Sequence, residues 1–445
     1  MKTEFTLAQL ADPDIAVADK ILRACVHCGF CTATCPTYVL LGDELDSPRG
    51  RIYLIKDMLE QQRPATRDVV KHIDRCLSCL ACMTTCPSGV NYMHLVDHGR
   101  EYIEKTYKRP IFDRLLRAML ARVLTNSGLF RTAVTGGIVA RPFAPLLRAL
   151  GMKRLAAMLR LTPRKKPAPP TERTGKVYAA QGHRRARVAL LSGCINPVLS
   201  PSTDEAAIRV LNRHGVEVVV AEGEACCGSL VHHMGREDEA LAFARNDIDA
   251  WTREIDSGGL DAILTTVSGC GTTLKDYGFM LRTDAAYAAK AAKVSALAKD
   301  VSEYLATLDL KPVPAAGGLT VAYHAACSLQ HGQNVTAAPK DLLGKCGFLV
   351  RDVPEGDLCC GSAGTYNILQ PALAARLRDR KVANIEPLKP DVIAAGNIGC
   401  LMQIASGTAI PVVHTVELID WATGGPAPET LTERGSVEAA PAAAG

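Results

Sequence analysis

Several features that would place a chain in a common protein class are missing here. No stretch of about 18 apolar residues is free of charge, so nothing in the sequence is expected to span a bilayer. The first residues are polar and acidic instead of basic and then apolar, which argues against a secretory signal peptide. No G-x-G-x-x-G run follows an expected strand, so we find no fingerprint for a flavin or nicotinamide dinucleotide bound to this chain.

Cysteine, by contrast, is abundant, with 17 in a chain of 445 residues. Without a signal peptide, so many thiols indicate metal or cluster binding in a reducing compartment instead of disulfides. A hydrophobic share of 48% is ample for packed cores, and the length suits about two to four domains. We therefore expect a cytoplasmic, globular protein of several domains.

Eight of the cysteines form two runs with the same spacing, C-x2-C-x2-C-x3-C followed by proline. This spacing is typical of ferredoxins with two [4Fe-4S] clusters, in which the fourth cysteine of each run binds the cluster of the other run. Zinc knuckles are the alternative, but a zinc site takes two separated pairs of ligands and not four in a row before a proline. The predicted ligand sets are Cys25, Cys28, Cys31 and Cys86 for one cluster, and Cys35, Cys76, Cys79 and Cys82 for the other.

A helix is expected between the two runs. Residues 51–60 carry apolar side chains at helical spacing, and the sequence Pro-Arg-Gly breaks the chain just before them. Arg49 and Arg51 would either offset the negative charge of a cluster or be solvated residues at the start of the helix. The first domain is therefore predicted to be an α-helical ferredoxin covering residues 1–108.

The second half of the chain contains an internal duplication. In each copy a single cysteine is followed 32 positions later by a Cys-Cys-Gly triplet, and then by one more cysteine. The two copies are offset by 133 positions, which is too long for a solenoid repeat and indicates duplicated domains. The two sets are Cys194, Cys226, Cys227 and Cys270, and Cys327, Cys359, Cys360 and Cys400.

Each copy is predicted to be an α/β domain. Buried-strand patterns alternate with helical ones, and in the first copy a helix capped by Ser202 or Thr203 ends at Gly215. The cysteines lie just past expected strands, which is where open parallel sheets place their ligands. The expected strands are residues 187–191, 216–220 and 261–267 in the first copy, and residues 319–323 and 391–395 in the second.

Each cysteine set is predicted to be a metal centre or a redox-active thiol site. Glycines beside the cysteines would let the backbone close around a large ligand. The alternatives are a strained disulfide between the adjacent cysteines and a set of inert buried thiols, and the matched spacing argues against the second. Cys346 has no counterpart in the other copy and is expected to be structural. Four nearby histidines are candidate ligands or proton donors: His232, His233, His324 and His331.

The region between the ferredoxin and the first copy is strongly basic. Residues 109–160 contain ten lysines and arginines against one acid, with leucines at helical spacing between them. Such a basic amphipathic helix lies on an anionic membrane face, or packs as a connector on its own protein or on a partner subunit. Residues 163–175 are a Pro-rich linker, and the sequence from residue 424 has the composition of a disordered tail. The expected limits of ferredoxin, connector, first copy, second copy and tail are 1–108, 109–175, 176–300, 301–422 and 423–445.

The Cys-Cys-Gly units resemble the cysteine-rich CCG domains of the heterodisulfide reductase B-subunit family. Members of that family end each unit with C-x2-C, whereas only the last of these two cysteines, Cys270 or Cys400, is kept here. Over about residues 5–422 the chain resembles the iron–sulfur subunits of membrane-linked hydroxy-acid and glycerol-3-phosphate dehydrogenases. Its opening stretch is similar to that of the glycolate oxidase (glycolate dehydrogenase) iron–sulfur subunits and reads CVHCGFCTATCPTYVLLGDELDSPRGRIYLIK.

This resemblance implies an α/β protein in which an N-terminal α-helical ferredoxin domain precedes two duplicated α/β CCG domains. It implies two [4Fe-4S] clusters on this chain, leaves open further iron–sulfur centres in the CCG domains, and places FAD on partner glycolate dehydrogenase subunits that oxidise glycolate to glyoxylate. The chain would carry no catalytic residue, and would pass electrons towards a respiratory quinone at the inner face of the cell membrane. No nucleic-acid partner is expected. The alternatives are a subunit of a D-lactate or an anaerobic glycerol-3-phosphate dehydrogenase, and a thiol–disulfide reductase acting at the CCG sites.

Overall fold

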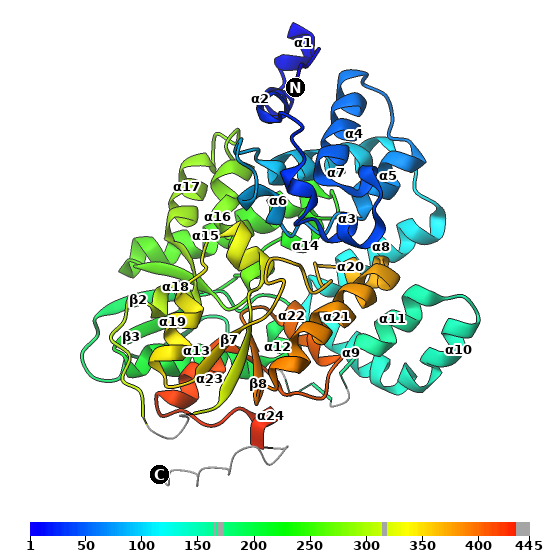
Figure 1. Cartoon of the computed structure of the whole chain (residues 1–445). Coiled ribbons are helices and arrows are strands. Elements are labelled where there is room, and N and C mark those ends of the chain that lie inside the picture. Colours follow the sequence, from blue (N-terminus) through cyan, green and yellow to red (C-terminus); the bar gives the residue numbers. More distant parts are fainter. Residues whose placement is uncertain (164–165, 168, 170–172, 314–317, 433–445) are drawn as a thin grey trace.

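The computed structural model describes residues 1–163, 166–167, 169, 173–313 and 318–432 (Figure 1). A helical N-terminal domain lies against two α/β domains, and a group of helices extends from the side of the molecule. The predicted fold class, a helical ferredoxin domain followed by two α/β repeats, is confirmed. Part of the predicted Pro-rich linker, and residues 433–445 of the predicted tail, lie outside the described residues.

The N-terminal domain is held together by the apolar faces of its longer helices. Leu22, Ile55, Leu95 and Ile103 are fully buried in the core that these helices share. Burial of this apolar surface is the main favourable term for so small a domain. The domain contains α1 (Leu7–Leu10), α2 (Pro13–Ala24), α3 (Pro36–Leu41), α4 (Pro48–Glu60), α5 (Arg67–Asp74), α6 (Ala81–Thr84) and α7 (Tyr92–Thr106).

Helix α4 begins earlier than the sequence predicts. Pro48 is its first residue, and the Ser47 hydroxyl accepts a hydrogen bond from the Gly50 backbone N–H at 3.0 Å. Proline fits the first turn of a helix because the N–H it lacks would have no helical partner there. The Pro-Arg-Gly sequence therefore starts the helix, with Ser47 as its cap, instead of breaking the chain before it.

The basic region forms four α-helices instead of one connector helix. Leu120 is buried against Ile368 of the second α/β domain. Arg117 is also buried and pairs with Asp74 and Asp113 at 2.8 Å and 3.0 Å, so part of the positive charge serves internal packing. Among the described residues, no helix is both long and apolar enough to cross a membrane. The four helices are α8 (Ile111–Leu124), α9 (Ser127–Ala140), α10 (Ala144–Ala149) and α11 (Lys153–Leu161).

The first α/β domain contains a five-stranded sheet in the order β1-β3-β2-β4-β5, in which only β1 is antiparallel to its neighbour. The three predicted strands correspond to β2, β3 and β4, whereas the sequence does not predict the three-residue strands β1 and β5. The strands are β1 (Lys176–Tyr178), β2 (Ala186–Leu190), β3 (Val216–Val220), β4 (Ala262–Thr265) and β5 (Ala298–Asp300). The main helices are α13 (Pro201–Arg213), which starts just before the predicted caps, α14 (Ser229–His232), α15 (Glu237–Gly258) and α16 (Ser268–Met280).

The second α/β domain repeats this arrangement with a four-stranded sheet, β7-β6-β8-β9, in which all neighbours are parallel. The two predicted strands correspond to β6 and β8. The strands are β6 (Thr320–His324), β7 (Leu349–Asp352), β8 (Val392–Ala395) and β9 (Val412–His414). The helices include α18 (Val301–Leu305), α19 (Ala338–Lys345), α20 (Tyr366–Leu369), α21 (Pro371–Ile385), α22 (Ile398–Ala405) and α23 (Thr415–Ala422).

The two α/β domains share one hydrophobic core. Val218 and Leu264 of the first sheet belong to the same buried cluster as Val321 and Val392 of the second. Leu431, in the short helix α24 (Glu429–Thr432), is fully buried in this cluster as well. Residues 424–432 are predicted to belong to a disordered tail, but the buried Leu431 side chain packs this segment against the core.

Candidate iron–sulfur and cysteine-rich sites

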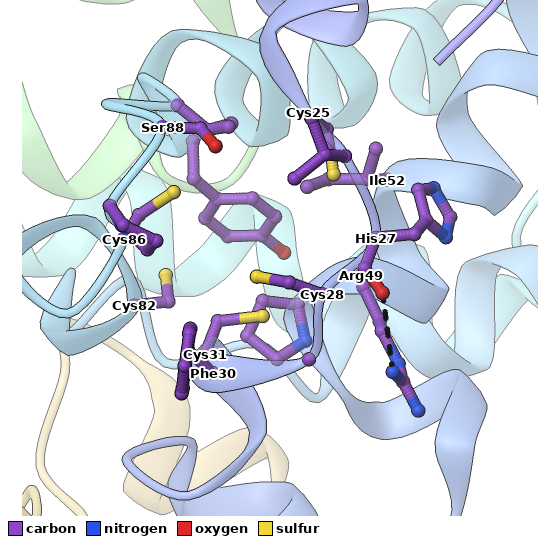
Figure 2. Close-up of a pocket in the computed structure, with 16 residues that line it drawn as sticks. Cys25, His27, Cys28, Phe30, Cys31, Arg49, Ile52, Cys82, Cys86 and Ser88 are labelled. Carbon is purple, nitrogen blue, oxygen red and sulfur yellow. Dashed lines mark hydrogen bonds between the residues drawn. The ribbon is translucent and has the colours of Figure 1, made fainter.

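The first predicted ligand set surrounds one pocket of the helical domain. Cys25 ends α2, Cys28 is exposed, and Cys31 lies on the 3₁₀ turn Phe30–Thr32. Cys86 approaches from the second cysteine run, as Figure 2 shows. These four cysteines line one pocket, and Cys82 of the second run lines it with them.

The second predicted set lines an adjacent pocket. Cys82 and Tyr92 border both pockets, so the two sites lie next to each other. The grouping of each fourth cysteine with the other run is the arrangement that exchanged ligands require. The second pocket contains Cys35, Cys76, Cys79 and Cys82.

The loops around both sites hold the same strained backbone conformation. The residues before and after the second cysteine of each run have positive φ angles: His27 (55°) and Gly29 (88°) in the first run, and Ser78 (48°) and Leu80 (62°) in the second. A left-handed conformation is costly for residues other than glycine, and such strain gathers at ligand sites. The repeated strain fits two loops that each wrap around a bulky group, as a cluster would require.

Arg51 supplies positive charge inside the second site. Its side chain is 1% exposed, and its Nη1 atom lies 3.7 Å from the Cys35 Sγ atom. It donates hydrogen bonds to the Thr37 hydroxyl at 2.9 Å and to the His72 carbonyl at 2.8 Å. Arg51 also pairs with the buried Asp46 at 3.4 Å. Arg49 pairs with Glu44 and lines the first pocket. Both arginines therefore lie beside a predicted cluster site, and Arg49 also stands in the first turn of α4.

The cysteine set of the second CCG domain lies directly against the helical domain. Cys79, from the second pocket, belongs to the same packed cluster as Cys327 and Cys359. The Cys327 and Cys359 Sγ atoms are 3.8 Å apart. His331 makes a hydrogen bond at 2.7 Å with the Thr84 hydroxyl, and so helps to fasten the two domains instead of facing the thiols.

His324 lies at the far end of this set. One ring nitrogen of His324 and the sulfur atoms of Cys360 and Cys400 lie within 4.8 Å of one another. All three residues are buried. Burial lowers the pKa of His324 to about 3, which keeps the ring neutral. The buried side chain of Lys381 lies nearby and donates a hydrogen bond to the Glu355 carbonyl at 2.6 Å.

The cysteine set of the first CCG domain has acidic neighbours. Hydrogen bonds from Cys194, and then from Cys227, lower the pKa of Cys226 to about 4. Asp247 is fully buried and accepts a hydrogen bond from the Ala225 backbone N–H at 2.8 Å. Burial raises its pKa to about 7.

The two histidines near this first set face the helical domain instead. His232 contacts Asp97 of α7 at 3.4 Å and Glu237 at 2.6 Å. His233 contacts the same Asp97 at 3.5 Å. They therefore link two domains, and of the four candidate histidines only His324 groups with cysteines among the described residues. The burial of Lys381 and Asp247 could not be predicted from the sequence, because charged residues on helices rich in polar residues are expected to face solvent.

Two family models match the chain. The "4Fe-4S dicluster domain" matches residues 21–90, and the "Cysteine-rich domain" CCG matches residues 188–275 and 321–405. Fold and sites together thus define a class: a dicluster iron–sulfur protein with two cysteine-rich domains. The predicted iron–sulfur cofactors are confirmed at this level.

Curated relatives narrow the class. The "Glycolate oxidase iron-sulfur subunit" of Escherichia coli (strain K12) is 45% identical over 95% of this chain and 99% of its own length. The "Probable glycolate oxidase iron-sulfur subunit" of Bacillus subtilis (strain 168) is 30% identical over 91% of this chain and 94% of its own. The chain belongs to the family of glycolate oxidase iron–sulfur subunits, as its opening stretch predicts.

Two further similarities are more distant. A fumarate reductase (CoM/CoB) subunit from Methanothermobacter marburgensis is 25% identical over 95% of this chain and 76% of its own length. The crystal structure of a hypothetical protein from Helicobacter pylori superposes with a TM-score of 0.55 at 10% identity, covering 94% of this chain and 74% of that one. This last similarity concerns the fold alone.

Proposed function

We propose that this chain is the electron-transfer subunit of a complex in which separate flavin-containing subunits oxidise glycolate to glyoxylate. That oxidation releases two electrons and two protons, and reduction of a quinone to a quinol would consume both. The absent dinucleotide fingerprint and the names of the two closely similar relatives support this division of labour.

The observation that carries the proposal is a continuous line of cysteine sites. It begins at the surface, where Cys28 is exposed, and continues through the adjoining pocket that shares Cys82. It reaches the second CCG domain where Cys79 packs with Cys327 and Cys359. Bound clusters supply one-electron transfer, and the protein holds their ligands close together and away from water. Electrons would enter near Cys28 and leave at the second CCG domain.

The experiment for the proposed division of labour uses the chain with and without its flavin partners. The purified chain, free of flavin, should not reduce a dye with glycolate, and adding the flavin subunits should restore the activity. Dye reduction by the flavin-free chain would contradict the proposal. Replacing glycolate with D-lactate or glycerol 3-phosphate in the restored complex tests the alternative substrates, and a disulfide offered to the dithionite-reduced chain tests the thiol–disulfide reductase.

Exchanged cluster ligands are also part of the proposal. Cys86→Ser should damage the cluster of the first pocket, although Cys86 belongs to the second run. Iron should fall by about half and electron transfer should be abolished, because one of two carriers is lost. Cys346→Ser is the matched control, since Cys346 lies in neither pocket. Electron paramagnetic resonance that assigns the lost signal to the second pocket would contradict the assignment.

The same complex would dock on the inner membrane face through helices α8 to α11. Large apolar side chains are exposed there, among them Phe112 (83%) and Val139 (73%). Exposed arginines such as Arg114 and Arg122 lie among them and would attract anionic lipid headgroups. Arg117 takes no part in this surface, because it is buried in ion pairs.

Binding to vesicles that contain anionic lipid tests this surface. Arg114→Glu with Arg122→Glu should weaken binding, and added salt should weaken binding of the unaltered chain as well. The control is Lys293→Glu with Lys389→Glu, which changes the same net charge at two exposed residues of the α/β domains. Equal losses from both pairs would show a net-charge effect only, and unchanged binding would exclude the surface.

A further inference from the structure

We propose that the second CCG domain holds a metal centre to which His324 contributes a ligand nitrogen, and that the first CCG domain holds none. The inference concerns metal content, so it can fail while the proposed electron-transfer function stands. It assigns different chemistry to two cysteine sets that are alike in sequence spacing.

The geometry of the second set is that of a partly assembled metal site. A nitrogen of His324 and the sulfur atoms of Cys360 and Cys400 lie within 4.8 Å of one another. His324 is 2% exposed, and neither ring nitrogen has a hydrogen-bond partner among the described residues. A buried imidazole without any partner is costly, and coordination to a metal would satisfy it.

The surroundings of these ligands favour an anionic centre. Thiolate ligands bring negative charge into the interior, and Lys381, which is 1% exposed, lies where its ammonium group can offset that charge. Asn397 donates a hydrogen bond to the Cys400 sulfur at 3.7 Å. Asn397 stands where the first cysteine of a C-x2-C pair would be, so an amide that supports Cys400 replaces a thiol there.

The first set lacks each of these features. Leu191 precedes Cys194 by the three positions that separate His324 from Cys327, so the imidazole has no counterpart. Val267, three positions before Cys270, stands in the place of Asn397. In the first domain, apolar side chains thus stand in the places of the His324 imidazole and of the Asn397 amide that supports Cys400.

The titratable side chain near the cysteine pair also differs between the two domains. Gly228 and Gly361, each after a cysteine pair, lie against the backbones of Ala240 and Ala374 in the following helix. Seven positions after these alanines the first domain has Asp247 and the second has Lys381, and both residues are buried. Lys381 can offset the charge of an anionic centre, whereas Asp247 at the equivalent position cannot. The first set therefore lacks the counter-charge that the second set has.

The donor set narrows the metal to a small class. Thiolate sulfur with imidazole nitrogen suits zinc, or iron held within a cluster, and does not suit magnesium or calcium. Cys359 adjoins Cys360 in the sequence and could complete the set, as could Cys327 beyond it. Measuring both zinc and iron shows which of the two metals the site holds.

The test is the metal content of the full chain, purified without oxygen and with its ferredoxin clusters in place. We expect metal beyond the iron of two [4Fe-4S] clusters, and we expect Cys360→Ser to remove that excess while Cys227→Ser leaves it. His324→Leu, which copies Leu191 of the first domain, should let a chelator extract the excess at least about tenfold faster. His324→Cys should retain it, because a thiolate can replace the imidazole.

Three outcomes would overturn the proposal. The first is that the chain contains no metal beyond the iron of the two clusters. The second is that Cys227→Ser and Cys360→Ser lose the excess metal equally. The third is that a chelator extracts the excess metal from His324→Leu no faster than from the unaltered chain. His331→Gln is the control for histidine replacement, since His331 contacts Thr84 of the helical domain. Absorption spectra of the ferredoxin clusters, recorded on every variant, show whether a loss comes from misfolding instead.

Discussion

The parallel strands of the first CCG domain, β3-β2-β4-β5, have the same order as those of the second, β7-β6-β8-β9. Each domain places a cysteine pair before a glycine with positive φ that packs against the next helix. Around these matched thiols the titratable side chains differ, with the carboxyl groups of Asp247 and Glu224 buried in the first domain and the amine of Lys381 in the second. A duplicated scaffold has thus kept its thiols while their electrostatic surroundings diverged, and those surroundings decide which charge state the thiols can hold.

The two domains also contact the helical domain in different ways. The first uses polar pairs, in which His94 meets Asp276 at 2.8 Å and His232 meets Asp97 at 3.4 Å. The second uses an apolar cluster that contains Leu77 and Cys79 together with Cys359. Only the second contact brings cysteines of two sites into one packed cluster among the described residues, so we assign the path of electrons to that side.

The largest effect is expected from reversing the charge that distinguishes the two domains. Lys381→Asp would bury a carboxylate beside the Cys359 and Cys360 thiols and the Glu355 carbonyl, and should lower the free energy of unfolding by about 3–5 kcal/mol. Urea unfolding measures this change. The exposed Lys389→Asp is the control and should alter stability by no more than about 0.5 kcal/mol. If Lys381→Asp proves as stable as the control, the buried charge does not distinguish the domains.

A smaller effect should separate the domains in electron transfer. Cys360→Ser should slow reduction of a quinone analogue by the complex at least about tenfold, which corresponds to about 1.4 kcal/mol in the barrier. Cys227→Ser should leave that rate nearly unchanged, because among the described residues its set shares no hydrophobic cluster with the second pocket. Flavin reduction by glycolate should be unaffected in both variants. Equal slowing would mean that both CCG domains carry electrons.

The smallest effect concerns pH and sharpens the contrast between the two contacts with the helical domain. Burial alone would lower the pKa of His232, but the carboxylates of Asp97 and Glu237 outweigh it and raise the pKa well above 6.5. His233 contacts the same Asp97 carboxylate, and Asp276 adds a further acidic group near His232. Because the folded state holds the proton more tightly, the stabilisation is fully present below pH 6.5 and is lost as the pH rises through the raised pKa.

Unfolding of wild type and His232→Gln at pH 6 and at pH 9 to 10 measures this contribution. The variant should be less stable by about 1 kcal/mol at pH 6, and the difference should shrink at the higher pH. His331→Gln, at the contact of the second domain, should show no comparable pH dependence. A difference of the same size at both pH values would show that His232 acts through packing alone.

The sequence predicts what depends on local spacing and misses what depends on packing between domains. The cysteine runs predict both pockets, and apolar runs predict the central strands. Strand β1 escapes prediction because Lys176 and Val177 are exposed on an edge, so no burial pattern marks it. The replacement of Leu191 by His324 is visible in the sequence, but the burial of Lys381 is not, because its helix segment is rich in arginine. The meeting of Cys79 with Cys359 arises only once separate domains pack together.

The core that the two sheets share has a consequence for how this chain can change over evolution. Side chains such as Val218 and Val321 lie in one buried cluster, so removing either domain would expose the apolar face of the other to water. The first domain therefore cannot simply be deleted, even if its cysteine set binds no metal as proposed. Its sheet forms the other half of a common interior, whatever its cysteines bind.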